Sequence, residues 1–313
     1  MALPIGVRRA AASQRWTAVF LAAVVTLLWS SSYVLIKIGL LGLPPLTFAG
    51  LRYFTAFGAL LAVHVARRRQ LPRSLGVPTW RALVALGLTT YAIVPGAMFV
   101  SLELLPVTTA NLIFQAGIPL TVALLSGLVL AEPTTMRQWA GVLLTVVGVY
   151  VFFPARPEGV ELLGVVLAGV AAVGGAAGNL LTRHLMRDRP LRARDVSMIS
   201  MGIGSSLLLL VSLFAEPFPR LTLTSIVLLA WLSLINTALA FTLWNLALRT
   251  LTALEGGVLA NAQIVEVALM AWLVLGETLS PARWLAALVI LVGVTLVQWR
   301  RPAAASVPTE SGN

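Results

Sequence analysis

The sequence predicts an all-α membrane protein with ten transmembrane helices, arranged as two inverted five-helix repeats. Of its 313 residues, 59% are hydrophobic and only 11% are charged, whereas soluble domains carry about 25% charged residues because their surfaces meet water. Apolar runs of about 20 residues, each long enough to cross a hydrocarbon core of about 30 Å, follow one another along the whole chain. The second half of the chain also repeats the pattern of the first half.

The expected helices follow from these apolar runs, which are too long for barrel strands and do not alternate between apolar and polar residues. They cover residues 16–38, 45–66, 81–102, 106–131, 135–154, 160–184, 196–215, 222–247, 252–276 and 281–299. Prolines such as Pro44, Pro106 and Pro281 lie at or between the helix ends, where the missing N–H costs least. The run from Trp16 is too long for a signal peptide and lacks a convincing cleavage site, so we expect it to be retained as the first helix.

The basic residues indicate which loops face the cytoplasm. If the N-terminus is cytoplasmic, 17 of the 22 Lys and Arg residues fall on the inner side, and the outer side holds Lys37, Arg52, Arg156, Arg220 and Arg283. Positively charged loops resist translocation, so we expect a multi-pass protein of the cytoplasmic (inner) membrane with both termini inside. The expected segments are a cytoplasmic N-terminal segment 1–15, a first repeat 16–154, an inverted second repeat 160–299 and a cytoplasmic tail 300–313.

The two halves align at an offset of 145 residues. Glu132 falls on Glu277 and Trp139 on Trp284, and 12 of the 28 positions from 122 to 149 are identical to their counterparts. Because each half has an odd number of helices, the second half must enter the membrane from the opposite side. Inverted repeats of this kind are typical of alternating-access transporters, whose substrate site lies near the midplane between the halves.

Several motifs occur at matching places in the two halves or near their first helices. The first helix contains LWSSSYVLIK at residues 28–37, and the second begins with two prolines at 44–45 and continues as LRYF at 51–54. Each half ends its fourth helix in Leu-Ala-Glu132 or Leu-Gly-Glu277, followed by a polar turn and a glycine-containing last helix. Together these motifs resemble those of the EamA-type members of the drug/metabolite transporter superfamily, and the resemblance covers nearly the whole chain. It implies a secondary active transporter with a central cavity that exports amino acids or other small metabolites, with proton coupling.

One position departs from the family pattern. The proline that is typical before the closing Leu-rich stretch is present as Pro119, but its counterpart in the second half is Ile264. Gln263 and Glu266 lie beside it. We therefore expect the local geometry and chemistry of the ninth helix to differ from those of the fourth.

Glu266 is the leading candidate for proton coupling. It lies well inside the ninth expected helix, where a charge facing lipid would cost about 2.5–3.5 kcal/mol. The side chain must therefore face the bundle, pair with a partner or be protonated. It either carries the coupling proton or binds a substrate ammonium group; the alternative is a structural role, with Arg52, Lys37 or an amide holding it in place.

The other candidate cavity residues are aromatic, hydroxyl and amide side chains within the helices, together with one arginine. They are Trp29, Ser32, Tyr33, Arg52, Tyr91, Phe99, Asn236, Trp244, Asn245, Asn261 and Gln263. The planar fork of Arg52 suits a carboxylate, and Trp29 and Tyr33 share a helix face. The alternative for each is packing or hydrogen bonding between helices.

Other functional classes lack the residues they need. The chain has no Cys, which excludes thiolate chemistry, and His64 and His184 stand apart from any further metal ligands. We expect no cofactor and no nucleic-acid partner, since the basic residues lie between membrane runs. The main alternative is an integral-membrane enzyme acting on a lipid or small molecule, but Asp188 and Asp195 form no paired acidic motif and no phosphate-binding loop is present. The expected partners are a small-molecule substrate, the bilayer and protons, with the chain a monomer or weak dimer.

Overall fold

The computed structural model confirms an all-helical membrane fold. It describes residues 5–68, 75–129, 135–153, 157–188, 191–251 and 253–298. Within these ranges there is no strand, and nine helices are long and apolar enough to cross a membrane. A tenth apolar helix, α6, has 17 residues. The tail 300–313 and Glu132 lie outside the described residues.

Each half of the chain supplies five membrane helices. The first half contains α1 (Ile5–Gly39), α2 (Pro45–Ala66), a third helix built from α3 (Val77–Leu86), η1 (Gly87–Ile93) and α4 (Val94–Leu104), then α5 (Val107–Val129) and α6 (Met136–Phe152). The second half contains α7 (Gly159–Asp188), α8 (Ala193–Ala215), an eighth helix built from α9 (Leu223–Ser233), η2 (Leu234–Leu239) and α10 (Ala240–Ala247), a ninth built from α11 (Ala253–Asn261), α12 (Gln263–Met270) and η3 (Ala271–Leu275), and α13 (Pro281–Gln298).

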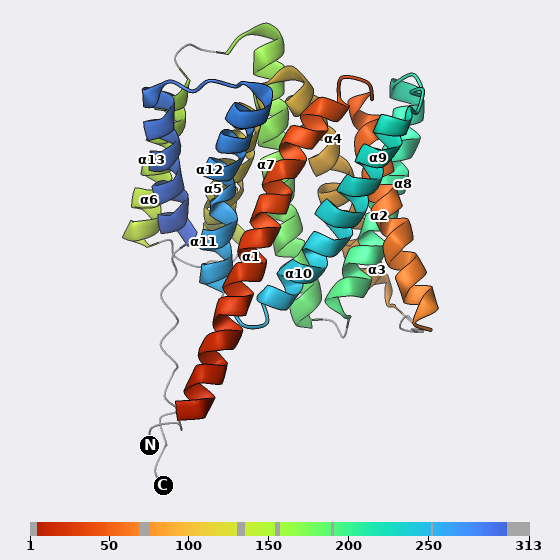
Figure 1. Ribbon diagram of the computed structural model, residues 1–313, viewed down its shortest axis with the longest axis horizontal. Coiled ribbons are helices and arrows are strands. Elements are labelled where there is room, and N and C mark those ends of the chain that lie inside the picture. Colours follow the sequence, from red (N-terminus) through yellow and green to blue (C-terminus); the bar gives the residue numbers. More distant parts are fainter. Residues whose placement is uncertain are drawn as a thin grey trace.

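The first helices of the two halves run in opposite directions. In Figure 1, α1 rises from the lower end of the bundle to the upper end, whereas α7 descends from the upper end. The start of α1 and the end of α13 lie at the same, lower end of the view. This is the arrangement expected when two five-helix repeats enter the membrane from opposite sides.

Three helices begin earlier than the sequence-based expectation by three residues or more. The first helix begins at Ile5 rather than at residue 16, so it extends into the expected N-terminal segment. No Gly or Pro interrupts residues 7–15, and the Ala-rich stretch there has high helix propensity. The third helix begins at Val77 rather than at residue 81, and α8 begins at Ala193 rather than at residue 196. Membrane hydropathy therefore located the spans but not the first turns of these three helices.

The third and eighth helices were expected to be uninterrupted, but each contains a π-helical segment at an equivalent position. Tyr91 in η1 and Asn236 in η2 differ by the repeat offset of 145 residues (236 minus 91). A π segment leaves carbonyl groups without their usual partners, and threonine hydroxyls take their place. Thr89 Oγ1 donates to the Ala85 carbonyl at 2.8 Å, and Thr237 Oγ1 donates to the Leu232 carbonyl at 2.9 Å. Such π segments are often found at functional sites.

Glycines allow the last helices of the two halves to pack closely. Helices α6 and α13 lie against each other. A Cβ atom on Gly141 would lie 2.7 Å from the Gly293 carbonyl oxygen, and one on Gly148 would lie 2.6 Å from the Ile290 side chain. The glycine residues therefore set the distance between these two helices.

Candidate functional site

Glu266 lies at the junction between the two halves and is held by hydroxyl groups. Its Oε1 accepts a hydrogen bond from Thr26 Oγ1 at 3.0 Å, and its Oε2 accepts one from Ser30 Oγ at 2.8 Å. Thr26 and Ser30 are buried and lie four residues apart on α1, so both face the same side of that helix. Among the described residues, no Lys or Arg nitrogen forms an ion pair with Glu266. The structural role in which Arg52 or Lys37 holds this carboxylate is therefore not what the fold adopts.

The helix that carries Glu266 is broken one turn before it. Helix α11 ends at Asn261 and α12 begins at Gln263, with Ala262 between them, whereas α5 continues through Pro119. Two amides on α5 bond to carbonyl groups beside the break. Asn111 Nδ2 donates to the Gln263 carbonyl at 3.2 Å and Gln115 Nε2 to the Ala260 carbonyl at 3.4 Å. The ninth helix therefore differs from the fourth, as expected from the missing proline.

The break also affects the electrostatics at Glu266. The residue lies in the first turn of α12, where unpaired backbone N–H groups and the helix dipole favour negative charge. Discontinuous membrane helices near the midplane form the ion and substrate sites of many inverted-repeat transporters. The helix end and the two hydroxyls thus support the carboxylate without a neutralising cation.

Arg52 is a second buried charge, and it is held by the opposite half of the protein. Arg52 lies in α2 and is only 5% exposed. Arg52 Nε donates to Thr237 Oγ1 in η2 at 3.3 Å, and its Cζ lies 5.3 Å from the centre of the Tyr53 ring. Tyr33 lies within electrostatic range of both Arg52 and Tyr53. Arg52 and two tyrosines from α1 and α2 therefore form one cluster.

Trp29 on α1 packs against aromatic side chains of the eighth helix. The Trp29 ring centre lies 5.1 Å from that of Trp244 and 5.5 Å from that of Phe241. Asn236 Nδ2 donates to the Leu28 carbonyl and, at 3.1 Å, to Ser31 Oγ. The structure thus brings three sequence-predicted residues together, namely Trp29, Asn236 and Trp244.

Other candidates lie elsewhere or are engaged in internal bonds. Phe99 is buried against Phe48, with ring centres 5.3 Å apart, and packs in the apolar core. Asn261 exchanges two hydrogen bonds with Gln298, and Ser32 Oγ donates to the Trp29 carbonyl at 2.6 Å. Two further candidates differ in environment: Asn245 is exposed, and Gln263 is buried.

Tyr91 extends the tyrosine cluster into the third helix. Its ring centre lies 5.9 Å from that of Tyr53, and its side chain lies near that of Ser197 on α8. Three tyrosines from three helices, with Arg52 beside them, therefore line one region between α1, α2 and η1.

Sequence reasoning missed several residues of this site. Thr26 and Ser30 were detectable as a pair of hydroxyls at a four-residue spacing on the first helix. Phe241 lies three residues before Trp244, so its place on the same face was also detectable. Nothing in the sequence indicated that Thr237 would meet Arg52, because that contact depends on how η2 packs against α2.

At the end of the bundle away from the chain termini, acidic side chains of the second half cap helices of the first half. Glu277 accepts hydrogen bonds from the backbone N–H groups of Val107 at 2.6 Å and Thr108 at 3.1 Å. Glu216 accepts hydrogen bonds from the N–H groups of Leu46 at 2.9 Å and Thr47 at 2.8 Å. These carboxylates satisfy N–H groups that have no partner within α5 and α2.

Lys37 contacts the same end of the bundle and not the central site. Its Nζ donates to the carbonyls of Leu102 at 2.6 Å and Leu105 at 2.9 Å, at the C-terminus of α4. A cation is favourable there because the helix dipole is negative at this end. Together with Glu277, Lys37 fixes the turn between α4 and α5 from both sides.

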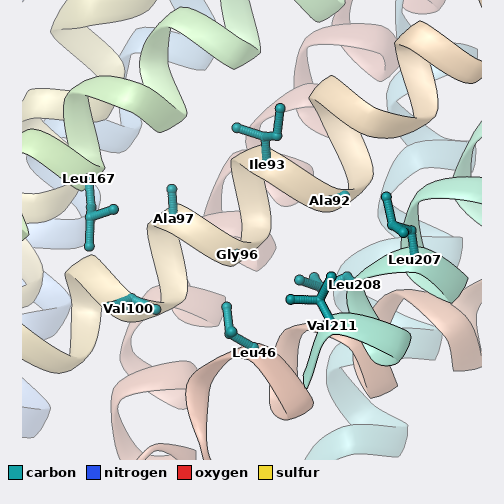
Figure 2. Close-up of a pocket in the computed structure, with 10 residues that line it drawn as sticks. All are labelled: Leu46, Ala92, Ile93, Gly96, Ala97, Val100, Leu167, Leu207, Leu208 and Val211. Atoms are coloured by element: carbon teal, nitrogen blue, oxygen red, sulfur yellow. The ribbon is translucent and has the colours of Figure 1, made fainter. Parts of the chain in front are cut away.

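A separate hollow lies on the side of the bundle and is lined by apolar side chains. Figure 2 shows its lining residues on α2, η1, α4, α7 and α8, and its volume is about 390 Å³. Ile93, Leu207 and Val211 beside it are exposed, so the hollow faces the hydrocarbon of the bilayer. It contains none of the charged or amide candidates and therefore does not suit a polar metabolite.

The described residues form ten apolar helices in two halves, with half-buried Glu266 and buried Arg52 where the halves meet. This arrangement defines a polytopic membrane transporter. The chain belongs to the EamA-like transporter family, whose model matches residues 16–153 and again residues 162–299. It is therefore a multi-pass transporter and not the membrane enzyme considered as the alternative.

Individual relatives agree with this assignment. A Salmonella typhimurium protein described as a "probable amino-acid metabolite efflux pump" is 29% identical over 88% of this chain and 92% of its own length. The Escherichia coli inner membrane transporter YedA is 25% identical over 87% of each chain. A solved crystal structure has the same fold, with a TM-score of 0.65 and 22% identity over 90% of this chain and 96% of the other.

Proposed function

We propose that the chain is a secondary active exporter of small organic metabolites such as amino acids. It works by alternating access as a proton antiporter in the cytoplasmic (inner) membrane, with both termini in the cytoplasm. The name of the Salmonella relative and the excess of basic residues on the proposed inner side support this proposal.

The observation that carries the proposal is the environment of Glu266. A hydroxyl can rotate to donate or to accept a hydrogen bond, so Thr26 and Ser30 can satisfy both the ionised and the protonated carboxyl group. An ion pair with Arg or Lys would instead hold the residue in its charged form. The two hydroxyls belong to the first half and Glu266 to the second half, so movement between the halves changes the proton's surroundings.

The metabolite is proposed to share this region with the proton. This region contains the Arg52 cation, the hydroxyls of Tyr33 and Tyr91, and the amide of Asn236. It also contains the aromatic faces of Trp29, Phe241 and Trp244. Such a mixture suits small amphipathic solutes, which need a few directed polar contacts within a mostly apolar wall. Binding of solute and proton in turn would couple export to the proton gradient.

The test is transport by the purified chain in proteoliposomes. The twenty common L-amino acids are screened by counterflow, in which unlabelled solute inside accelerates entry of labelled solute. Wild type, Glu266→Gln and the exposed control Glu161→Gln are then compared with and without a pH gradient. We expect Glu266→Gln to retain counterflow but to lose acceleration by the gradient, while the control keeps both. Equal acceleration in all three proteins would refute the role of Glu266, and absence of counterflow for every amino acid would refute the proposed substrate class.

A further inference from the structure

We propose that Arg52 is the carboxylate anchor of the transport site and that Thr237 is the residue that positions it. The transporter would then select solutes that carry a carboxylate over their decarboxylated amines. This inference rests on the proposed function and adds to it the chemical group that the site recognises and the residue that orients the recognising side chain.

The first step is that Arg52 lacks a charge partner. A buried cation within a membrane span is expensive and is usually paired or functional. In the part of the chain that the structure describes, no carboxylate oxygen lies within the ion-pair distance of 4.0 Å from Arg52. Arg52 is nevertheless only 5% exposed, between helices of the two halves. An anion that arrives from outside the protein would supply the missing charge.

The second step is that the guanidinium is held on one edge only. Of its donors, Nε bonds to Thr237, and no other side-chain hydrogen bond to the described residues is formed. The two terminal nitrogens form no hydrogen bond with the described residues, yet they are not among the fully buried polar atoms that lack a partner. Both nitrogens are therefore in contact with accessible space. Two parallel N–H donors on one edge match the two oxygens of a carboxylate.

The third step is that η2 fixes the direction of this fork. The hydroxyl of Thr237 donates to the carbonyl of Leu232, five residues earlier, at 2.9 Å. Its hydrogen is thereby committed, and its oxygen is left to accept from Arg52 Nε at 3.3 Å. Ser233 Oγ, at the end of α9 directly before η2, donates to the Arg52 carbonyl at 2.9 Å. The junction of α9 and η2 in the second half therefore holds both the backbone and the side chain of Arg52.

The fourth step links this fork to the proton site through α1. Tyr33, which lies within electrostatic range of Arg52, is one turn beyond Ser30 on α1. Ser30 bonds to Glu266, and one helical turn is about 5 Å along the axis. Helix α1 therefore connects the carboxylate anchor to the proton site, so that occupancy of one can be sensed at the other.

The experiment uses three pairs of solutes that differ only in the carboxylate. They are L-leucine and isopentylamine, L-phenylalanine and phenethylamine, and L-lysine and cadaverine. Counterflow of each labelled amino acid is measured in proteoliposomes, with its amine as competitor. We expect at least one of the amino acids to be exchanged, with its amine competing at least about tenfold more weakly, as for the loss of one charge-assisted contact.

Two matched substitutions test the positioning role. Thr237→Val keeps the shape but removes the hydroxyl, whereas Thr237→Ser keeps the hydroxyl. We expect Thr237→Val to raise the half-saturation concentration for the amino acid about tenfold, to change the maximal rate little, and to leave the amine's inhibition constant unaltered. Thr237→Ser should behave like wild type, and thermal unfolding in detergent shows that each variant is folded.

The outcomes separate the inference from the proposed function. The inference would be overturned if the amines compete as well as the amino acids. It would also be overturned if Thr237→Val and Thr237→Ser have the same half-saturation concentration. In both cases the proposed transport function would still stand. If none of the three amino acids is exchanged and an amine is, the inference is also overturned. If no member of any pair is exchanged, the proposed amino-acid substrates fail, and the inference fails with them.

Discussion

Glu277 of the second half accepts two hydrogen bonds from Thr108 of the first half, one from its N–H at 3.1 Å and one from its hydroxyl at 2.8 Å. Glu216 makes the same pair of contacts with Thr47, at 2.8 and 2.9 Å. One carboxylate thus caps α5 and the other caps α2, both from helices of the opposite half. The two caps tie the halves together at the end of the bundle away from the termini.

Removing either cap should destabilise the protein. We expect Glu277→Ala and Glu216→Ala each to cost about 1–2 kcal/mol of folding free energy, because each leaves backbone N–H groups at a helix start without a partner. Thermal unfolding in detergent measures the loss. Glu103→Ala serves as a control, since Glu103 is exposed at the same end of the bundle. Equal midpoints for the three variants would contradict the capping role.

A single methyl group should disturb the contact between the last helices of the two halves. In Gly141→Ala the new Cβ would lie 2.7 Å from the Gly293 carbonyl oxygen, and such overpacking costs about 1–3 kcal/mol. Gly58→Ala is the matched control because a Cβ there meets nothing within 4 Å. The control should be neutral or slightly stabilising, as alanine is a better helix former. Unfolding midpoints that fall in Gly58→Ala but not in Gly141→Ala would be the contrary result.

The hydroxyls at Glu266 should be needed for proton-driven transport. In the Thr26→Val, Ser30→Ala double variant, the Glu266 carboxyl group loses both of its hydroxyl partners from the first half. We expect the double variant to keep counterflow but to lose about tenfold of its acceleration by a pH gradient. Initial rates with and without the gradient measure this ratio. An unchanged acceleration in the double variant would contradict the role of these hydroxyls.

Much of the fold was predictable from the sequence because each membrane span is determined by its own run of apolar residues. Ten apolar runs and the 145-residue repeat were enough to predict ten helices in two halves. The π segments and the break at Ala262 were not predictable in this way. They depend on side chains that satisfy freed carbonyls, such as Thr237 within its own helix and Asn111 from a different helix.

The charged members of the site were the most predictable from the sequence. Glu266 and Arg52 stand out because charge is costly within a membrane. Of their partners, Thr26 and Ser30 share a four-residue spacing on one helix, whereas Thr237 becomes notable only once the two halves are packed together. Phe99 illustrates the converse, since an aromatic residue at a matched repeat position lies in the apolar core against Phe48.

In alternating access, the two inverted halves expose one shared site to the two sides of the membrane in turn. The chain contains no cysteine, so Ser31→Cys, next to Asn236, places a single thiol at that site without background. A membrane-impermeant thiol reagent is applied from either side to right-side-out and inside-out vesicles. We expect this thiol to react from both sides and a saturating transported amino acid to slow the reaction from each side. Labelling from one side only, whatever the solute or pH, would contradict alternating access.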